Sequence, residues 1–152
     1  MQIKEITQNK NNFMDILLIG DEEQSMIEKY LALGRLFVLY SSNIPVSVCV
    51  VQQIDESIAE IKNLATYPEQ QNKGYATELL NFVFKKYKNA GYKNIILGTG
   101  ENEITLNFYK KRGFVETHRI KNFFINNYLH PIIENGKQLI DMVYLKKDLT
   151  LS

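Results

Sequence analysis

The sequence has few of the features that mark secreted, membrane-bound or metal-binding proteins. Its 152 residues include one cysteine, Cys49, so no disulfide can form within the chain. No stretch approaches the ~20 consecutive apolar residues of a membrane-spanning helix, and the amino terminus lacks the basic-then-apolar pattern of a signal peptide. The two histidines, His118 and His130, have no third ligand at metal-site spacing. We therefore expect a cytoplasmic protein with no metal site and no membrane partner.

The sequence also lacks an excess of charge of one sign. Eighteen Lys and Arg side chains stand against 17 Asp and Glu side chains, so the formal net charge is +1. The longest basic run is Lys110-Lys111-Arg112, which is typical of a solvated helix face. Nucleic acid is therefore not an expected partner. The one thiol, Cys49, lies in the apolar run 46–51 and is expected to be a small core residue.

The order of apolar patterns predicts the fold. Period-two and continuous apolar runs predict strands at residues 1–7, 36–40, 46–54, 57–67, 94–98, 114–120 and 139–147. Helical spacing predicts helices at residues 9–20, 21–34, 74–90 and 104–112. Asp21 is expected to cap the second of these helices, and the last is expected to have Ile104 and Phe108 on its inner face and Gly113 as its left-handed cap. Residues 122–137 have no clean period and are expected to form a long ordered loop. We expect one α/β domain over residues 1–152, with a mixed, mostly antiparallel sheet flanked by about four helices.

The chain is organised around the turn between a strand that ends at Pro68 and a helix that begins near Gly74. Residues at offsets of three and four give that helix one buried face: Ala76, Leu79, Leu80, Val83, Phe84, Tyr87 and Ala90. The first N–H groups of a helix have no intrahelical partners and lie at the positive end of the helix dipole, so a phosphate can bind there. Gly74 and Ala76 keep side chains away from this end.

Three motifs carry a resemblance to a known family. Gln71, Gly74 and Ala76 fit the pattern Q/R-x-x-G-x-G/A, and the turn resembles the acetyl-CoA pyrophosphate loop of the GNAT superfamily of N-acetyltransferases. Leu64-Ala-Thr-Tyr-Pro68 resembles the strand end before that loop, and Asn102 with Tyr109-Lys-Lys-Arg-Gly-Phe114 resembles the family's N-x(6)-Y-x-x-x-G-F segment. The alternative for the turn alone is an ordinary Asn-Lys-Gly turn that caps a helix.

The resemblance implies that acetyl-CoA is the co-substrate. It places the pyrophosphate at Gln71, Asn72, Lys73, Gly74, Tyr75, Ala76 and Thr77. It places pantetheine along the backbone of Leu64, Ala65 and Thr66, with one N–H facing the thioester oxygen. Asn102 resembles a pantetheine-contacting residue and can also be a helix N-cap. Two positions depart from the family pattern, Asn72 for glycine and Thr66 for valine, and asparagine tolerates the left-handed backbone that such a turn needs.

The resemblance also suggests catalytic groups. Tyr109 is expected to donate a proton to the departing CoA thiolate, because a phenol with a pKa near ~10 is protonated at pH 7. The alternative role for Tyr109 is a core aromatic. Glu60 is the candidate base for the attacking amine, with Glu56 as its nearest competitor. The alternative for Glu60 is a surface-exposed strand residue paired with Lys62.

The acceptor is the least defined part of these expectations. Tyr128, His130 and Glu134 combine an aromatic ring, an imidazole and a carboxylate in one segment, which suits recognition of an amine, although a structural role for that segment is the alternative. We expect acetyl transfer to a primary amine of a small molecule by direct attack in a ternary complex. Protein or peptide acetylation, and a non-catalytic CoA-binding regulatory module, are the alternatives, and a homodimer is left open.

Overall fold

The computed structural model describes residues 1–151, which form two compact units, an amino-terminal unit of residues 1–92 and a carboxy-terminal unit of residues 93–151. Each unit contains helices and antiparallel strands. No helix in the described part of the chain is both long enough and apolar enough to cross a bilayer. The sequence-based prediction of one domain over residues 1–152 stays a prediction.

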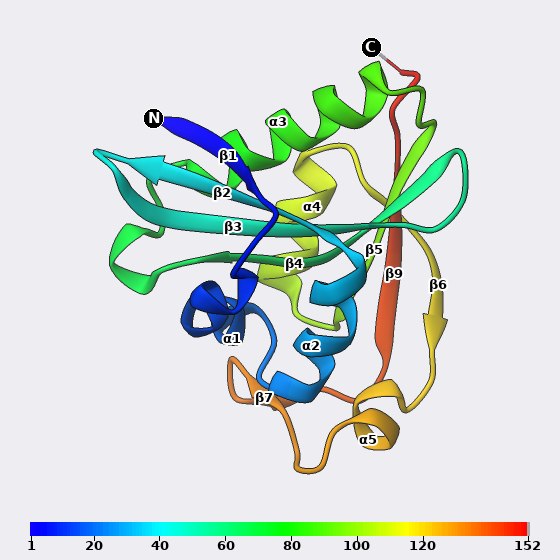
Figure 1. Ribbon diagram of the computed structural model, residues 1–152. Helices are drawn as coiled ribbons and strands as arrows, with labels where there is room; N and C mark the ends of the chain where they lie inside the picture. Colours follow the sequence, from blue (N-terminus) through cyan, green and yellow to red (C-terminus); the bar gives the residue numbers. More distant parts are fainter. Residues whose placement is uncertain (152) are drawn as a thin grey trace. The chain divides into compact units, whose positions relative to one another are not determined.

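The amino-terminal unit is built on four strands in the order β1-β2-β3-β4, each antiparallel to its neighbour (Figure 1). They are β1 (Gln2–Ile6), β2 (Arg35–Ser41), β3 (Ile44–Gln53) and β4 (Ile58–Thr66). All four match predicted strands to within a few residues. Continuous runs of buried, mostly apolar residues fill β2 and β3, which is typical of strands covered on both faces.

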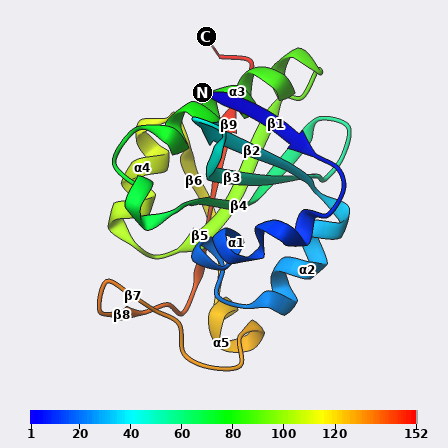
Figure 2. The same cartoon turned by 60° about the vertical axis from the view of Figure 1, so that its left-hand side comes forward.

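Helices cover both faces of these strands, as Figures 1 and 2 show. One face carries a 3₁₀ turn (Lys10–Phe13), α1 (Met14–Gly20) and α2 (Gln24–Leu33), and the other carries α3 (Tyr75–Asn89). Ile16 and Leu17 of α1 and Ile27 of α2 pack with Val48 and Val50 of β3 in one buried apolar cluster. One buried core therefore anchors both helices to the sheet.

Two details of the predicted helices are wrong. Asp21 does not cap α2: the N-cap position is Glu23, and the Asp21 carboxylate instead accepts hydrogen bonds from the Glu23 N–H (3.2 Å) and the Tyr30 hydroxyl (3.1 Å). Ala90 is exposed, because α3 ends at Asn89 and Ala90 is already its C-cap. Both errors lie at helix ends, where side-chain capping competes with the tertiary contacts of the capping residue.

A β-bulge in β4 sets which of its side chains share a face. Val50 pairs with Asn63 whereas Val51 pairs with Ile61, so Lys62 is the extra residue on β4. As a result Glu60, three positions before Asn63, lies on the same face as Asn63. Because Val48 and Val50 lie on this face too, it is the one that α1 and α2 cover.

Asn63 ties β4 to both of these helices. Its amide nitrogen donates to the Leu17 carbonyl of α1 (2.9 Å) and to the Tyr30 hydroxyl of α2 (3.0 Å). Its buried oxygen, Oδ1, has no hydrogen-bond partner among the described residues and points at Gly20. A Cβ on Gly20 would collide with that oxygen and would also lie 3.3 Å from Cβ of Ala65. Gly20 is therefore needed for close approach of α1 to β4.

Gly20→Ala should lower the free energy of unfolding by about 1–3 kcal/mol, the usual cost of overpacking a core. Its gain in helix propensity is at most about 1 kcal/mol, because glycine is the weaker helix former. Urea denaturation measures the effect. If the collision is the cause, adding Asn63→Ala should cost less in the Gly20→Ala background than in the wild type, and simple additivity of the two changes would contradict this account.

The carboxy-terminal unit has three long strands in the order β5-β9-β6, again antiparallel. These are β5 (Asn94–Gly100), β9 (Met142–Asp148) and β6 (Val115–Ile120), and α4 (Glu103–Lys111) joins β5 to β6 (Figure 1). The predicted left-handed glycine after α4 is confirmed, since Gly113 has φ of 96°. The predicted inner face of α4 is partly wrong: Ile104 is 71% exposed, and Leu106 and Tyr109 are its buried residues.

The predicted long loop at residues 122–137 is wrong in its detail. It contains α5 (Phe123–Asn127) and β7 (Ile133–Glu134), which forms a small hairpin with β8 (Lys137–Gln138). The hairpin turn is Asn135-Gly136, both in left-handed backbone with φ of 50° and 76°. Phe124, Ile132 and Leu139 form a small buried cluster beneath this segment. That cluster gives the segment order without long elements.

Candidate functional site

The turn between β4 and α3 has the backbone that an anion site needs. Asn72 (φ 62°) and Gly74 (φ 86°) are both left-handed, as expected for this turn, and Gly74 is the N-cap of α3. The first hydrogen bond of α3 runs from the Glu78 N–H to the Gly74 carbonyl at 3.0 Å. The N–H groups of Tyr75 and Ala76 precede it, at the positive end of a 15-residue helix. Apart from Gly74 and its two chain neighbours, no atom of residues 1–151 lies within 4 Å of a Cβ built on Gly74, so the space before this end is open.

Side-chain contacts hold this turn against the sheet. The Gln71 side-chain amide donates to the Thr66 carbonyl at the end of β4 (3.1 Å), and the Tyr75 hydroxyl lies 3.3 Å from Ser41 Oγ at the end of β2. Lys73 Nζ contacts Gln70 Oε1 at 3.3 Å. The glutamine of the motif thus points back to β4 and braces the turn. Sequence reasoning placed Gln71 at the pyrophosphate and missed this bracing bond.

The last residues of β4 are fixed on the β3 side. Leu64, Ala65 and Thr66 pair with residues 49, 48 and 47 of β3. Ser47 Oγ donates its one proton to the Ala65 carbonyl (2.9 Å), so Thr66 must be the donor in the 2.9 Å contact between the two hydroxyls. The Thr66 hydroxyl proton therefore points toward β3. This accounts for a threonine where the family pattern has valine: its polar atom is satisfied within the sheet.

Glu60 is buried on β4. Its residue exposure is 7%, and its Oε2 lies 3.2 Å from Nζ of Lys62. The pairing with Lys62 was foreseen, but the surface exposure that the alternative interpretation required is absent. The competitor Glu56 is exposed in the β3–β4 connection. Of the two carboxylates, only Glu60 lies on the β4 face that α1 and α2 cover.

Cys49 lies on β3, opposite Leu64, and is fully buried. Burial raises the pKa of its thiol well above the usual range, because the thiolate would be desolvated. The residue is a core residue, as expected, and a nucleophilic role for it is disfavoured.

Tyr67, at the end of β4, makes a contact that the sequence did not reveal. Its hydroxyl donates to Asp15 Oδ2 of α1 at 2.9 Å. Burial, and then this hydrogen bond, raise the pKa of Tyr67 to about 12. The phenol is therefore protonated at neutral pH and links the end of β4 to α1.

In the carboxy-terminal unit, Tyr109 is held by aromatic packing. The residue is 8% exposed, and its ring makes edge contacts with Phe108 (centroids 5.3 Å apart) and Phe114 (5.5 Å). The motif's Phe114 is thus the packing partner of its tyrosine. These contacts depend on the ring and not on the hydroxyl group, a distinction that a Phe substitution can test.

Asn102 is both a helix cap and a junction. Its Oδ1 accepts from the N–H groups of Ile104 (3.0 Å) and Thr105 (3.5 Å), which confirms the N-cap alternative. It also contacts the β7–β8 hairpin: Asn102 Nδ2 donates to Glu134 Oε1 (3.2 Å), and Asn135 Nδ2 donates to Asn102 Oδ1 (3.1 Å). The Asn135-Gly136 pair was the available sequence signal for this hairpin.

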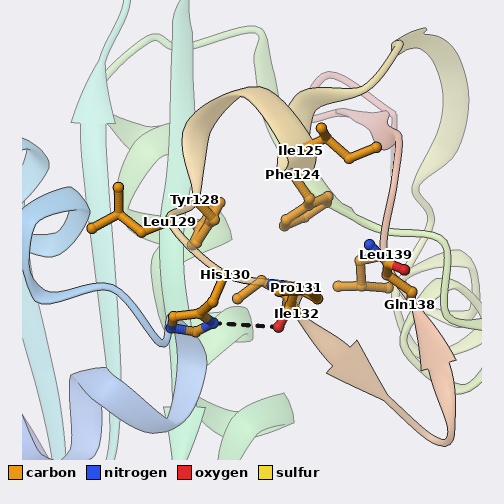
Figure 3. Close-up of a pocket in the computed structure, with 9 residues that line it drawn as sticks. All are labelled: Phe124, Ile125, Tyr128, Leu129, His130, Pro131, Ile132, Gln138 and Leu139. Atoms are coloured by element: carbon orange, nitrogen blue, oxygen red, sulfur yellow. Dashed lines mark hydrogen bonds between the residues drawn. The ribbon is translucent and has the colours of Figure 1, made fainter.

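The three residues predicted to bind the acceptor separate into two places. Tyr128 and His130 line a cavity of about 170 Å³ together with Phe124, Ile125, Leu129, Pro131, Ile132, Gln138 and Leu139 (Figure 3). Glu134 is not part of this lining and pairs with Asn102 instead. The cavity is mainly apolar, and His130 Nδ1 lies 3.3 Å from the carbonyl oxygen of Pro131. Its chemistry suits an apolar group better than a cation.

No group of three or more His, Cys, Asp and Glu side chains among residues 1–151 is arranged to hold a metal ion.

Comparison with known proteins decides the family. The sequence profile of the acetyltransferase (GNAT) family matches residues 9–114. The chain belongs to the GNAT family of acetyltransferases. An uncharacterized N-acetyltransferase of Bacillus subtilis (strain 168), YvbK, is 31% identical over 143 residues, which are 93% of this chain and 92% of that protein.

Solved structures agree with this assignment. A GNAT family acetyltransferase from Elizabethkingia anophelis with acetyl-CoA bound matches with a TM-score of 0.92 and 36% identity, over 97% of each chain. A Bacillus subtilis acetyltransferase in complex with CoA matches with a TM-score of 0.89 and 30% identity, also over 97% of each chain. The predicted mixed α/β GNAT fold is confirmed. As a GNAT acetyltransferase, the protein is an acyltransferase enzyme.

Proposed function

We propose that this protein transfers the acetyl group of acetyl-CoA to a primary amine of a small molecule. The observation that carries the proposal is the β4–α3 turn, where left-handed Asn72 and Gly74, braced by Gln71, leave open space before the α3 amides. Helix amino termini of this kind bind phosphate through several N–H groups at once. The relatives whose structures contain acetyl-CoA or CoA support the same cofactor.

In this proposal the pyrophosphate lies on the backbone of residues 71–77, and the pantetheine amides follow Leu64, Ala65 and Thr66. Peptide groups at the end of a strand can pair with the extended pantetheine chain as they would with another strand. Asn102 supplies a further contact. A backbone N–H of the β4 segment stabilises the negative charge that develops on the thioester oxygen, a contribution typically worth ~3 kcal/mol of barrier.

Glu60 and Tyr109 carry the proton transfers. Glu60 takes a proton from the acceptor ammonium, because only the neutral amine has a lone pair to attack with. Glu60 passes this proton to the solvent. The amine nitrogen then bonds to the acetyl carbon in a ternary complex, the carbon–sulfur bond breaks, and the positively charged nitrogen loses its second proton to solvent water, which leaves the neutral amide. Tyr109 gives its phenolic proton to the departing sulfur and regains one from the solvent. No acyl-enzyme is needed, in keeping with the inert Cys49.

Glu60→Gln is expected to lower kcat chiefly at acidic pH. Below the pKa of the acceptor most of the amine is protonated, so the base matters most there, and its loss should cost ~10²-fold, the lower end of the range that a general base typically supplies. At high pH free amine is abundant and the loss should shrink. The measurement is kcat against pH for the wild type and the variant.

Two control variants separate the base from its surroundings. Lys62→Ala breaks the 3.2 Å ion pair but keeps the Glu60 carboxylate, and Glu56→Gln removes the exposed carboxylate nearby. Both should keep the wild-type shape of the pH profile. A Glu60→Gln profile that parallels the wild type would assign proton removal to water or to another group.

The cavity formed by residues 124–139 favours a small acceptor with an apolar part. Its volume of about 170 Å³ can hold a side group of modest size but not a part of a folded protein surface. Phe124, Tyr128 and Ile132 give the cavity apolar walls. We therefore propose that the acceptor is an amine with a compact aromatic or branched aliphatic group.

The test is a panel of primary amines that differ in that group, with peptides and simple alkylamines alongside, and free CoA thiol as the readout. The proposal expects the highest kcat/KM for the compact apolar amines. Enlarging the cavity with Phe124→Ala should shift the preference toward bulkier amines. Peptides preferred over every small amine, with no effect of Phe124→Ala, would instead support a protein acetyltransferase.

A further inference from the structure

The outer strand of the carboxy-terminal unit, β6, is unusually exposed. Among the described residues it pairs with β9 alone, at the end of the order β5-β9-β6, and all six of its residues are exposed. They include two β-branched apolar residues at its ends, Val115 (60% exposed) and Ile120 (40%). An edge strand presents unpaired backbone groups that can extend the sheet with another strand.

A bulge decides which β6 side chains share a face. Glu116 pairs with Leu145 and His118 pairs with Tyr144, so Thr117 is the extra residue. Glu116 and Arg119 therefore lie on one face, opposite the buried Leu145 and Val143. Val115, His118 and Ile120 lie on the other face, where the His118 ring stacks on Tyr144 with centroids 4.9 Å apart. In a regular strand Glu116 and Arg119 would point to opposite faces.

This arrangement makes β6 complementary to a second copy of itself. We propose that two copies of the chain pair through antiparallel β6 strands about a two-fold axis at His118. If the bulged Thr117 is left out of the pairing register, Glu116 lies opposite the partner's Arg119, and Val115 lies opposite the partner's Ile120. Directly opposed residues of antiparallel strands must point to the same face, and both of these pairs do so only because of the bulge. The interface is isologous, so each contact occurs twice.

The charges around β6 extend this complementarity. Glu116 Oε2 forms an ion pair with Nζ of Lys110 at 2.7 Å, and Arg119 Nη1 forms one with Oε2 of Glu101 at 2.7 Å. All four side chains remain partly exposed. Pairing two strands would create two rows in which positive and negative groups alternate: Lys110, Glu116, the partner's Arg119 and the partner's Glu101. Networks of this kind favour one partner and one register over others. A partner without this sequence would place like charges or unmatched groups opposite them.

One strand pair buries little area compared with the 1,200–2,000 Å² typical of stable complexes, so we expect a weak, concentration-dependent dimer. Sedimentation velocity over a concentration series should show the mass rising from 17.7 kDa toward twice that value. Glu116→Arg places arginine opposite arginine in the paired strands, and Arg119→Glu places glutamate opposite glutamate. Each variant alone should remain a monomer at concentrations where the wild type associates.

The decisive experiment mixes the Glu116→Arg and Arg119→Glu variants. In a mixed pair every arginine faces a glutamate, so an equimolar mixture should associate as the wild type does although neither component does so alone. Loss of the intrachain pairs with Lys110 and Glu101 cannot produce such a rescue, because both losses persist in the mixture. Lys85→Glu, a charge reversal of the same size on the exposed side of α3, should leave association unchanged. Circular dichroism establishes that each variant is folded.

A wild type that stays at 17.7 kDa throughout the series would overturn the proposal. So would variants that associate like the wild type, or a mixture that remains monomeric. In those cases the bulge and the charges of β6 protect an edge strand against association, which is the other known use of such features. The experiment measures mass and not catalysis, so its outcome is independent of the proposed reaction.

Discussion

Gly74→Glu is expected to remove measurable acetyl-CoA binding from a protein that remains folded. The substitution places a carboxylate in the open space before the α3 amides, where the proposed pyrophosphate would lie. Two like charges ~4 Å apart repel by about 4 kcal/mol at an effective dielectric constant of ~20, which corresponds to an affinity loss on the order of 10³-fold. Isothermal titration calorimetry with acetyl-CoA measures the loss.

The chain offers a matched control for this variant. Gly91, just beyond the other end of α3, has φ of 92° and equally open space around a built Cβ, so Gly91→Glu adds the same charge and a similar left-handed strain of about 1–2 kcal/mol. A glutamate is also less favourable at the carboxyl end of a helix than at the amino end. Gly91→Glu should therefore be at least as destabilised as Gly74→Glu, yet bind acetyl-CoA normally. Equal losses in both variants would reduce the effect to stability, and unchanged affinity in Gly74→Glu would remove the cofactor site from this turn.

The parts of the fold that follow from local signals were predictable. The apolar period of α3, the left-handed Asn72 and Gly74 before it, and Gly113 after α4 are all encoded within a few residues of where they act. The seven longer strands, β1 to β6 and β9, were also recovered to within a few residues, because their apolar runs are bounded by turn residues. The motifs of the β4–α3 turn, which resemble those of the GNAT family, are local for the same reason.

What the sequence did not reveal depends on register and on long-range contacts. The bulge at Lys62 puts Glu60 and Asn63 on one face of β4, and no local pattern marks a bulge of that kind. Asn102 meets Glu134 across 32 residues of chain, so its role as a junction requires the fold. Ile104 was assigned to the buried face of α4 by its hydrophobicity, and helix spacing alone could not choose between it and Leu106. The hairpin at Asn135-Gly136 is the exception, because its turn signal was present and was overlooked.

Tyr109→Phe is expected to give the largest catalytic loss of any conservative change in the chain. The Phe108 and Phe114 contacts involve the ring, so the variant should keep nearly the wild-type melting temperature and acetyl-CoA affinity. The substitution removes the hydroxyl group and, with it, the phenolic proton. If that proton reaches the departing sulfur in the transition state, kcat and kcat/KM should fall together by ~10²–10⁴-fold, the usual range for general acid catalysis.

A second buried tyrosine supplies the control. Tyr87 of α3 is 2% exposed, and burial raises its pKa to about 12, so Tyr87→Phe also removes a buried hydroxyl group. It should change stability by about 1 kcal/mol and leave kcat close to the wild type. Equal kinetic losses in the two variants would mean that any buried hydroxyl matters, which packing alone could explain.

The identity of the lost proton can be tested through the leaving group. An acetyl donor whose thiol is more acidic than CoA expels a more stable thiolate, which gains less from protonation. The ratio of wild-type to Tyr109→Phe kcat should therefore fall as the thiol becomes more acidic, whereas a purely structural defect would leave this ratio constant. A folded Tyr109→Phe enzyme with wild-type turnover toward acetyl-CoA would reduce Tyr109 to a packing residue, and the sulfur would then have to take its proton from water.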